Sequence, residues 1–248
     1  MKTQTLLPLL ILAAGLAAPA DAALYLGNGQ SGFGGAVGGG SLNITDDGTN
    51  LSFTFTRGAG NFNDTLVLYF DTNPGGAAAY GPTGEVGSPF VGRRAIVNEF
   101  GSGITFGGGF ASDFAFSLKA DGSASNHLFT TPSGANANSL VFITTAAVTN
   151  FGNAGASSYT WTIAMSDLGV NPGDTFNFVS TYLNPNGGAG SDASFRSNEG
   201  FVYDFGASSP GFSGVTVNNS LSYTATPEPG VALLGSLGVL LLLRRRKQ

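Results

Sequence analysis

Residues 51–56 have the sequence Leu-Ser-Phe-Thr-Phe-Thr, and residues 65–70 have the sequence Thr-Leu-Val-Leu-Tyr-Phe. In the first stretch apolar and hydroxyl side chains alternate, which is the two-residue period of a strand with one buried and one solvated face. The second stretch is apolar at nearly every position, which is typical of a central strand covered on both faces. The two stretches therefore predict a β protein.

Similar strand-like runs recur between turn residues. They lie at residues 94–97, 113–118, 140–145, 159–165, 175–183, 199–205 and 213–223. Turn residues such as Asn73-Pro74-Gly75-Gly76 separate them. The only helical signal is a single turn at Ser166–Gly169, which Ser166 or Asp167 would cap and Gly169 would end. We predict an all-β fold, a single antiparallel β-sandwich or jelly roll over residues 23–220, with about nine to twelve strands.

The composition excludes several kinds of catalytic and metal site. The 248 residues include no cysteine and one histidine, His127. Without cysteine there can be no disulfide, thiolate nucleophile or Cys-ligated metal centre. His127 could serve a Ser-His-Asp triad only as its sole base, and no acid–base pair of carboxylates can be identified from the sequence. We therefore predict that the protein is not an enzyme and has no catalytic residues.

The charge balance excludes another class of partner. Between residues 23 and 226 there are five basic and thirteen acidic residues, a net charge of −8. Nucleic-acid binding needs a basic stripe, and the sequence contains none in this part. An acidic surface is compatible with neutral polysaccharide or divalent cations.

The N-terminal residues follow the plan of a secretory signal. Lys2 precedes an apolar stretch from Leu6 to Ala18, and Ala20-Asp21-Ala22 forms a small-x-small cleavage site. The apolar stretch has about 13 residues, which is shorter than the ~20 that a membrane-spanning helix needs. We therefore predict a signal peptide over residues 1–22, with Ala20 and Ala22 at the cleavage site.

The C-terminal residues have three parts in a fixed order. Pro227-Glu228-Pro229 is followed by the uncharged segment Val231–Leu243 and then by Arg244-Arg245-Arg246-Lys247. A helix over Val231–Leu243 would be about 20 Å long, against a hydrocarbon core of about 30 Å. The cations would stay on the cytoplasmic side. We predict a tether at residues 221–226 and a marginal membrane-spanning helix at residues 231–243.

This order of parts resembles the PEP-CTERM sorting tail of bacterial exosortase substrates. The resemblance covers residues 227–248 and rests on Pro227, Glu228 and Pro229 together with Arg244, Arg245 and Arg246. It implies export, transient retention in the inner membrane and recognition of the Pro-Glu-Pro region by an exosortase. Release or transfer to the cell surface or to an exopolysaccharide matrix would follow. The alternative is an ordinary tail anchor, which would not require Pro-Glu-Pro.

A second, weaker resemblance concerns the β domain. Residues 62–72 and 159–169, followed by 172–176, are similar to strands of DOMON-like and family-nine-like carbohydrate-binding sandwiches. The resemblance implies a β-sandwich of that type and favours glycan binding. The paired tryptophans with which such modules stack on sugar rings are absent, because Trp161 is the only tryptophan.

Four residues are candidates for contact with a glycan. Trp161 could be a stacking platform, but it shares a strand face with Tyr159 and Ile163, which favours a core position. Tyr182 is one of three candidate exposed aromatic residues, with Tyr80 and Tyr203. Arg196 and Asn198 could donate hydrogen bonds to sugar hydroxyls. The alternative for Arg196 is a structural pair with Glu199 or another acid that fixes a loop over the sandwich edge.

Two Asp/Asn-rich turns are candidates for a calcium site. They lie at residues 46–50 and 71–73. Their oxygens could collect Ca²⁺, or they could close turns by bonding to their own backbone, and the second interpretation is favoured. We predict no other cofactor and no other metal site.

These observations together favour an exported cell-surface or exopolysaccharide-matrix protein of structural or adhesive type. The alternative is a carbohydrate-binding module that docks to exopolysaccharide. A polysaccharide-acting hydrolase or lyase is the third possibility, and it lacks an identifiable acid–base pair.

Overall fold

The computed structural model describes residues 22–81, 91–97, 103–120, 126–131, 140–185, 195–202 and 205–226. They belong to one compact unit, Ala20–Thr226. Most of the predicted signal peptide, including Ala20, and all of the predicted sorting tail lie outside the described residues.

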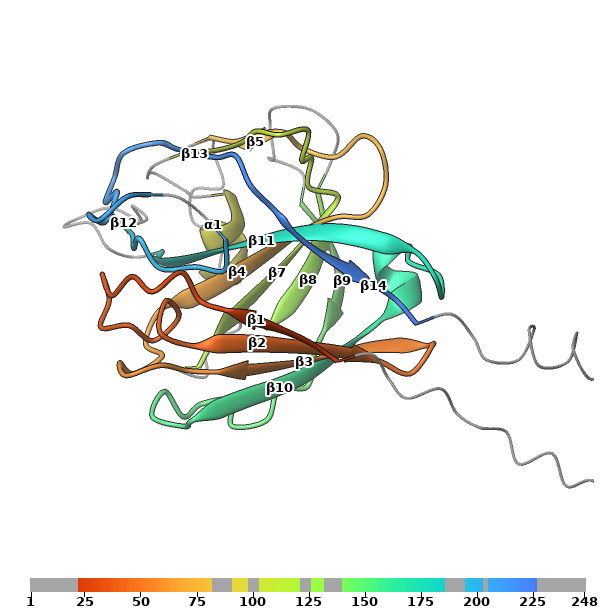
Figure 1. Cartoon of the computed structure of the whole chain (residues 1–248), viewed down its shortest axis with the longest axis horizontal. Helices are drawn as coiled ribbons and strands as arrows, with labels where there is room; N and C mark the ends of the chain where they lie inside the picture. The colour runs from red at the N-terminus through yellow and green to blue at the C-terminus, as the bar shows by residue number, and fades with distance from the viewer. Residues whose placement is uncertain are drawn as a thin grey trace, which may run out of the picture. The chain divides into compact units, whose positions relative to one another are not determined.

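Two antiparallel sheets pack face to face, which confirms the predicted all-β sandwich (Figure 1). The four-stranded sheet has the order β1 (Ala23–Leu26), β2 (Ser41–Asp46), β3 (Asn50–Thr56) and β10 (Ser158–Ala164). The seven-stranded sheet has the order β12 (Phe195–Arg196), β11 (Thr175–Asn184), β4 (Thr65–Asp71), β7 (Phe114–Lys119), β8 (His127–Thr130) and β9 (Val141–Thr145). Its seventh strand, β14 (Leu221–Thr224), also pairs with β11.

Smaller elements cover the outer face of the seven-stranded sheet. The helix α1 (Val91–Val97) packs on β4 and β7. A three-stranded sheet consists of β13 (Val215–Val217), β6 (Ile104–Phe106) and β5 (Ala79–Tyr80).

The 3₁₀ turn η1 (Met165–Leu168) follows β10 and ends at Gly169, whose φ of 63° is left-handed. The predicted end at Gly169 is confirmed, but neither Ser166 nor Asp167 caps the turn, because Ala164 occupies the N-cap position.

The main core lies between the two large sheets. The alternation of residues 51–56 is confirmed, because Leu51, Phe53 and Phe55 are buried and the intervening positions are not. The opposing sheet contributes Leu66, Leu68, Phe70, Phe116, Leu118, Leu128, Phe176, Phe178 and Tyr182. Burial of this much apolar surface is the main favourable contribution to folding.

A second core lies on the other face of the seven-stranded sheet. Val67 and Tyr69 of β4 face it, so every residue from Thr65 to Phe70 is buried. The prediction of a strand covered on both faces is therefore confirmed. The covering side chains come from α1 and the three-stranded sheet, and they include Ala95, Ile96, Val97, Tyr80, Ile104, Phe106 and Val217.

The strand predicted at residues 94–97 was wrong. These residues belong to α1, where Ala95, Ile96 and Val97 lie against the seven-stranded sheet. The Tyr69 hydroxyl donates a hydrogen bond of 2.9 Å to the Ile96 carbonyl oxygen near the end of the helix. A short apolar run without alternation suits either a strand or a buried helix, and the need to cover this sheet face selects the helix.

Two further predictions of local structure need correction. Residues 199–202 form no strand, and Val202 has a left-handed φ of 45°. The run at 213–223 is divided between β13 and β14.

The predicted tether at residues 221–226 is mostly β14, which pairs with β11 from Thr175↔Thr224 to Phe178↔Leu221. The β domain therefore continues to Thr226.

Candidate functional site

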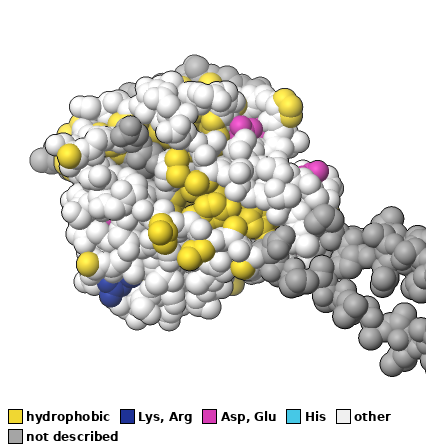
Figure 2. Space-filling model, in the orientation of Figure 1, with side chains coloured by type: hydrophobic (Ala, Val, Ile, Leu, Met, Phe, Trp, Pro, Cys, Tyr) yellow, Lys and Arg dark blue, Asp and Glu magenta, His cyan; other side chains and the backbone are white. Residues whose placement is uncertain are grey.

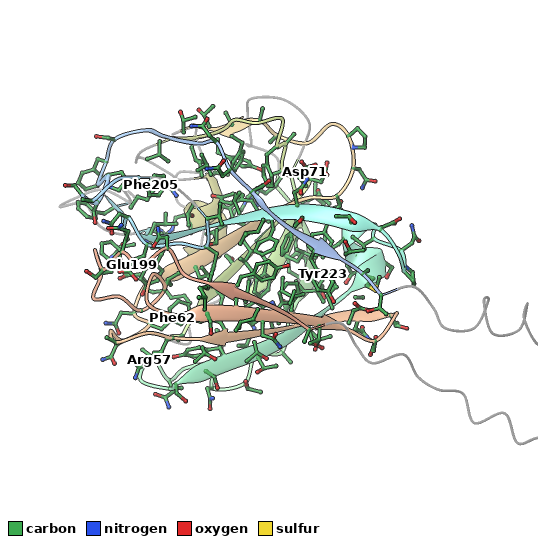
Figure 3. All side chains as sticks on the ribbon, viewed as in Figure 1. Arg57, Phe62, Asp71, Glu199, Phe205 and Tyr223 are labelled. Carbon is green, nitrogen blue, oxygen red and sulfur yellow. The ribbon has the colours of Figure 1, made fainter. Side chains whose placement is uncertain are left out.

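The Glu199 side chain binds the glycine-rich loop between β1 and β2, residues 27–40, at one end of the sandwich (Figure 3). Its side chain is fully buried, and its carboxylate accepts four backbone N–H hydrogen bonds. The donors are Phe33 at 2.5 Å, Gly35 at 3.2 Å, Val37 at 2.8 Å and Gly38 at 3.0 Å. Hydrogen bonds from several backbone amides satisfy a buried carboxylate without a cation.

The backbone of this loop approaches the Glu199 carboxylate closely because the loop contains glycine. Gly35 has a φ of +81°, which an L side chain rarely adopts. A Cβ on Gly38 would lie 2.1 Å from the carbonyl oxygen of Gln30. The glycine runs of this loop therefore allow backbone amides to converge on one carboxylate.

Asn198 connects the same loop to the segment that follows. Its Oδ1 accepts a hydrogen bond of 3.0 Å from the Gly32 amide, and its Nδ2 donates to Gln30 Oε1 at 3.2 Å and to the Ala207 carbonyl oxygen at 2.9 Å. Asn28 Nδ2 donates to the Asn198 carbonyl oxygen at 2.7 Å. Asn198 is almost fully buried, so it positions these chain segments rather than meeting a glycan.

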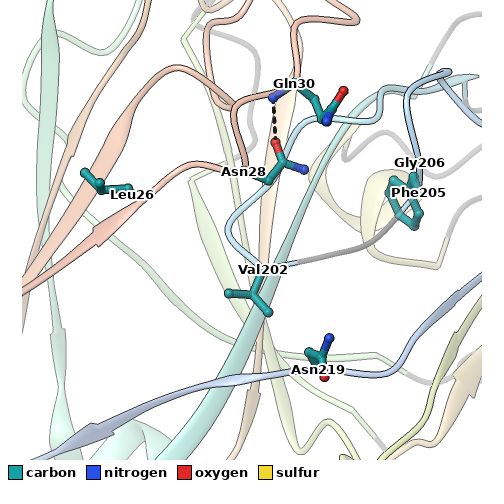
Figure 4. A pocket seen from close by; sticks show the side chains of 7 residues that line it. All are labelled: Leu26, Asn28, Gln30, Val202, Phe205, Gly206 and Asn219. Atoms are coloured by element: carbon teal, nitrogen blue, oxygen red, sulfur yellow. Dashed lines mark hydrogen bonds between the residues drawn. The ribbon is translucent and has the colours of Figure 1, made fainter.

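A pocket of about 350 Å³, here called the carboxamide pocket, opens beside this network (Figure 4). Its lining residues are Leu26, Asn28, Gln30, Val202, Phe205, Gly206 and Asn219. The lining combines three carboxamides, two aliphatic side chains and one aromatic ring, and it carries no charged side chain. The Asn219 carboxamide and Gln30 Nε2 make no hydrogen bond within the described part of the chain, so both can serve a ligand.

Hydrophobic side chains continue across the surface that includes β1. Leu24 and Leu26 of β1 are 64% and 71% exposed. Figure 2 shows a band of hydrophobic side chains across this face, with few charged side chains beside it. The pocket therefore lies on an uncharged part of an otherwise acidic domain.

Three of the four candidate glycan residues gather at this end of the fold, but all three are buried. Tyr182 is fully buried against Phe33 and Phe62, with ring centroids 5.6 and 5.7 Å away, so its ring has no exposed face on which a sugar could stack. Burial raises the pKa of the Tyr182 phenol. Arg196 is also fully buried and makes no hydrogen bond to Glu199, so the pair with Glu199 that the sequence suggested does not form.

The fourth candidate, Trp161, is a core residue. It is 1% exposed and stacks between Phe53 and Phe116, with both ring centroids 5.3 Å away. Tyr80, another aromatic residue considered, is also buried, and Tyr203 lies outside the described residues. The aromatic ring that does line the pocket, Phe205, was not predicted, because no local sequence signal distinguishes it from the other 19 phenylalanines.

The Asp-rich turn at residues 46–50 uses its oxygens for hydrogen bonds. Asp47 Oδ1 accepts the amides of Thr49 and Asn50 at 2.9 and 2.7 Å, as in an Asx turn. Asp46 Oδ2 accepts the Tyr223 hydroxyl at 2.6 Å and both the amide and the hydroxyl of Thr226 at 3.0 Å. Asp46 therefore ties the end of the β domain to β2.

In the second turn, residues 71–73, two backbone amides donate to Asp113, which lies outside the turn. Asp113 accepts the amides of Thr72, Asn73 and Gly76 at 2.8, 2.8 and 3.1 Å. Burial raises the pKa of Asp71, and the neighbouring Asp113 charge adds to the shift. Asp47 therefore bonds the backbone of its own turn, as the sequence favoured, whereas the amides of Thr72 and Asn73 donate to Asp113 from another segment.

His127 lies in a strand and contacts aromatic rings. It is 7% exposed, and its Nδ1 lies 2.9 Å from Thr145 Oγ1. Its ring packs edge-on against Phe142 at 5.5 Å. Burial lowers the pKa of the imidazole.

No protein-family model matches the chain, and no curated protein matches it. Within the described ranges, no group of three or more His, Cys, Asp or Glu side chains is placed to hold a metal ion. In the same ranges, no helix has the length and apolar character needed to cross a membrane, and residues 231–243 lie outside them.

Proposed function

We propose that this protein is exported and is a structural or adhesive component of the cell surface or of an exopolysaccharide matrix. An exosortase-type tail delivers it, with transient retention in the inner membrane. The observation that supports this proposal is the position of the limits of the β domain. β1 begins at Ala23, directly after the expected cleavage site, and Thr226, directly before Pro227, makes the last tertiary hydrogen bonds within the described residues.

The two limits have a physical consequence for processing. In the described part of the chain, every strand pair of the sandwich lies between Ala23 and Thr224, so none of these pairs needs residues 1–22 or 227–248. Asp46 accepts two hydrogen bonds from Thr226 and one from Tyr223, which fixes the end of the described domain. A protease that acts near Pro227 would therefore leave a folded product.

Mass spectrometry of the native protein tests this proposal. We expect a product that begins at Ala23, and a form truncated near Pro227 in the medium or matrix fraction. A chain from which residues 227–248 are deleted should lose its normal location. An intact tail in every fraction, or an unchanged location after the deletion, would overturn the proposal.

The pocket beside Phe205 favours a second candidate function, binding of a neutral glycan. Carboxamides donate and accept hydrogen bonds to hydroxyls, and an aromatic ring can pack on the apolar face of a sugar. Gln30, Asn219 and Phe205 line the pocket together, and no charged group lines it. Its volume of about 350 Å³ falls within the usual range of ligand pockets.

A polysaccharide pull-down tests the second candidate. We expect the double variant Gln30→Ala with Asn219→Ala to lose affinity for neutral polysaccharide by at least about tenfold, because two hydrogen-bonding groups are removed. Asn43→Ala, on the outward face of the four-stranded sheet, is the matched control and should bind normally. Equal binding by the double variant would exclude this pocket as the glycan site.

A further inference from the structure

The outer face of the seven-stranded sheet contains buried polar groups that the fold does not satisfy. Thr65 Oγ1, Ser117 Oγ and Thr181 Oγ1 have no hydrogen-bond partner within the described residues, and all three side chains are fully buried. The same holds for Nε and both terminal nitrogens of Arg196. Native proteins pair nearly all of their buried polar groups, so this concentration on one sheet face needs a physical reason.

The strand register places these groups near one another. Arg196 of β12 lies opposite Leu183 of β11, and Leu183 lies opposite Thr65 of β4, which lies opposite Lys119 of β7. Thr181, two residues before Leu183 on β11, occupies the next row on the same face. A row of four neighbouring strands therefore carries an arginine, a threonine and a lysine.

The Arg196 guanidinium has three identified neighbours. Burial raises the pKa of Tyr69 to about 12, and the Arg196 charge together with the Thr181 and Arg196 side chains beside the phenol opposes that rise. The Phe205 ring lies 5.9 Å from the guanidinium carbon. The Tyr69 hydroxyl already donates its proton to the Ile96 carbonyl oxygen. None of these neighbours supplies a negative charge.

Arg57, whose guanidinium nitrogens all donate hydrogen bonds, provides a comparison for Arg196. Its guanidinium donates hydrogen bonds to the carbonyl oxygens of Gly58, Ala59, Gly60, Gly155 and Ala156, at 2.7–3.2 Å. Arg57 is also only partly buried, whereas Arg196 is fully buried. A buried charge without a partner is strongly unfavourable, and arginine cannot relieve the cost by losing its proton.

Positive charge is otherwise rare in this domain, yet it is concentrated here. Four of the five basic residues between residues 23 and 226 belong to elements of this face, namely Arg93 and Arg94 of α1, Lys119 of β7 and Arg196 of β12. The helix α1 packs on β7 and β4. In a domain with a net charge of −8, most of the positive charge therefore lies on elements of this face.

We propose that Arg196 is the centre of a binding site for a small oxoanion, a carboxylate or a phosphate. The planar guanidinium presents paired N–H groups that match two oxygens of such an anion. The Thr181 hydroxyl donates a further hydrogen bond. The Phe205 ring, 5.9 Å from the guanidinium carbon, lines the carboxamide pocket and a smaller hollow beside Pro210 and Val215. The proposal does not depend on export or on glycan binding.

Thermal unfolding of the full chain in mild detergent tests this proposal. Chloride is replaced stepwise by acetate or by phosphate at constant ionic strength. We expect the Tm to rise with the logarithm of the concentration of the anion that binds, by about 5–10 °C at a hundredfold excess over the Kd. The acetate and phosphate series show which oxoanion the site prefers. A Tm that neither anion raises would overturn the proposal.

Two variants separate specific binding from general salt effects on stability. Arg196→Met should abolish the anion-dependent rise, whereas Arg57→Met should lower the Tm and retain the rise. If Arg196→Met does not fold, Arg196→Lys supplies the comparison, because lysine keeps the charge and loses the paired geometry. We expect Arg196→Lys to require at least about ten times more anion for the same rise. The same anion dependence in wild type and in either Arg196 variant would overturn the proposal.

Discussion

Glu199 Oε2 accepts the backbone N–H of Val37 at 2.8 Å, which joins segments separated by 162 residues. The same carboxylate takes three more amides of the loop, so one side chain fixes the conformation of a segment that has no strand of its own. This loop and the segment after Glu199 contribute Asn28, Gln30 and Val202 to the carboxamide pocket. The pocket therefore depends on a buried carboxylate that does not itself line it.

Glu199→Gln should lower the free energy of unfolding by about 2–4 kcal/mol. The variant replaces one acceptor oxygen by an NH₂ group that faces backbone donors, and it weakens the remaining charge-assisted bonds. Urea denaturation measures the loss. Asp167→Asn is the matched control and should change stability by no more than about 0.5 kcal/mol, because Asp167 is only partly buried. Equal stability of wild type and Glu199→Gln would contradict the role given to this carboxylate.

Asp46→Ala should loosen the end of the β domain. The variant leaves the Tyr223 hydroxyl and both donors of Thr226 without their acceptor, at a cost of about 1–3 kcal/mol. Hydrogen exchange followed by mass spectrometry should show faster exchange in β14. Asp47→Ala removes only contacts within the neighbouring turn and should leave β14 protected. Unchanged exchange in β14 after Asp46→Ala would show that pairing with β11 alone holds this strand.

Trp161 should have the fluorescence of a fully buried indole. Because its ring is stacked between Phe53 and Phe116, we expect blue-shifted emission that acrylamide and added polysaccharide leave unchanged. A Trp161→Phe chain that carries Phe142→Trp provides the exposed reference, since Phe142 is 54% exposed. Its emission should be quenched. Quenching of wild type to the same extent would place Trp161 at the surface.

Alkaline pH should unfold the domain through its buried tyrosines. Burial raises the pKa of Tyr69 to about 12 from 10.0, and it also raises the pKa values of Tyr80 and Tyr182. The protonated phenol is favoured in the folded state, so this stabilisation is complete below pH 10 and is lost as the pH rises toward 12. Near-ultraviolet absorbance should show Tyr25, the least buried of the described tyrosines, ionising first and the buried tyrosines ionising together with unfolding.

Tyr80→Phe provides the control for the alkaline transition. The variant should remove one phenol from the late step and leave the early step unchanged. If all seven tyrosines ionised reversibly near pH 10 in a folded chain, the burial of Tyr69, Tyr80 and Tyr182 would be contradicted.

The strands were predictable where one side chain in two meets the core. Leu51, Phe53 and Phe55 alternate with hydroxyl residues because β3 has one solvated face, and β4 is apolar throughout because it has none. Residues 94–97 carry no period that distinguishes a helix from a strand. Their conformation depends on the apolar face of the seven-stranded sheet, which local sequence does not reveal.

The candidate site was predicted in part. The segment from Arg196 to Asn198 was singled out from the sequence together with Tyr182, and the structure brings these residues to one end of the sandwich. It also buries them, and it lines the pocket with Asn28, Gln30, Phe205 and Asn219 instead. Asn28 and Gln30 are far from Phe205 and Asn219 in the chain, so only the tertiary fold makes the two pairs neighbours.

The amino-acid sequence by itself determined the β class of this protein and the absence of cysteine chemistry. These properties follow from residue types and from the period of apolar positions, which are local. Only the tertiary structure decided that Glu199 bonds to backbone amides rather than to Arg196, and that the Arg196 guanidinium faces a buried sheet surface. The reason is that hydrogen-bond partners and burial are set by contacts across more than 100 residues of chain, as the bond between Glu199 and Val37 shows.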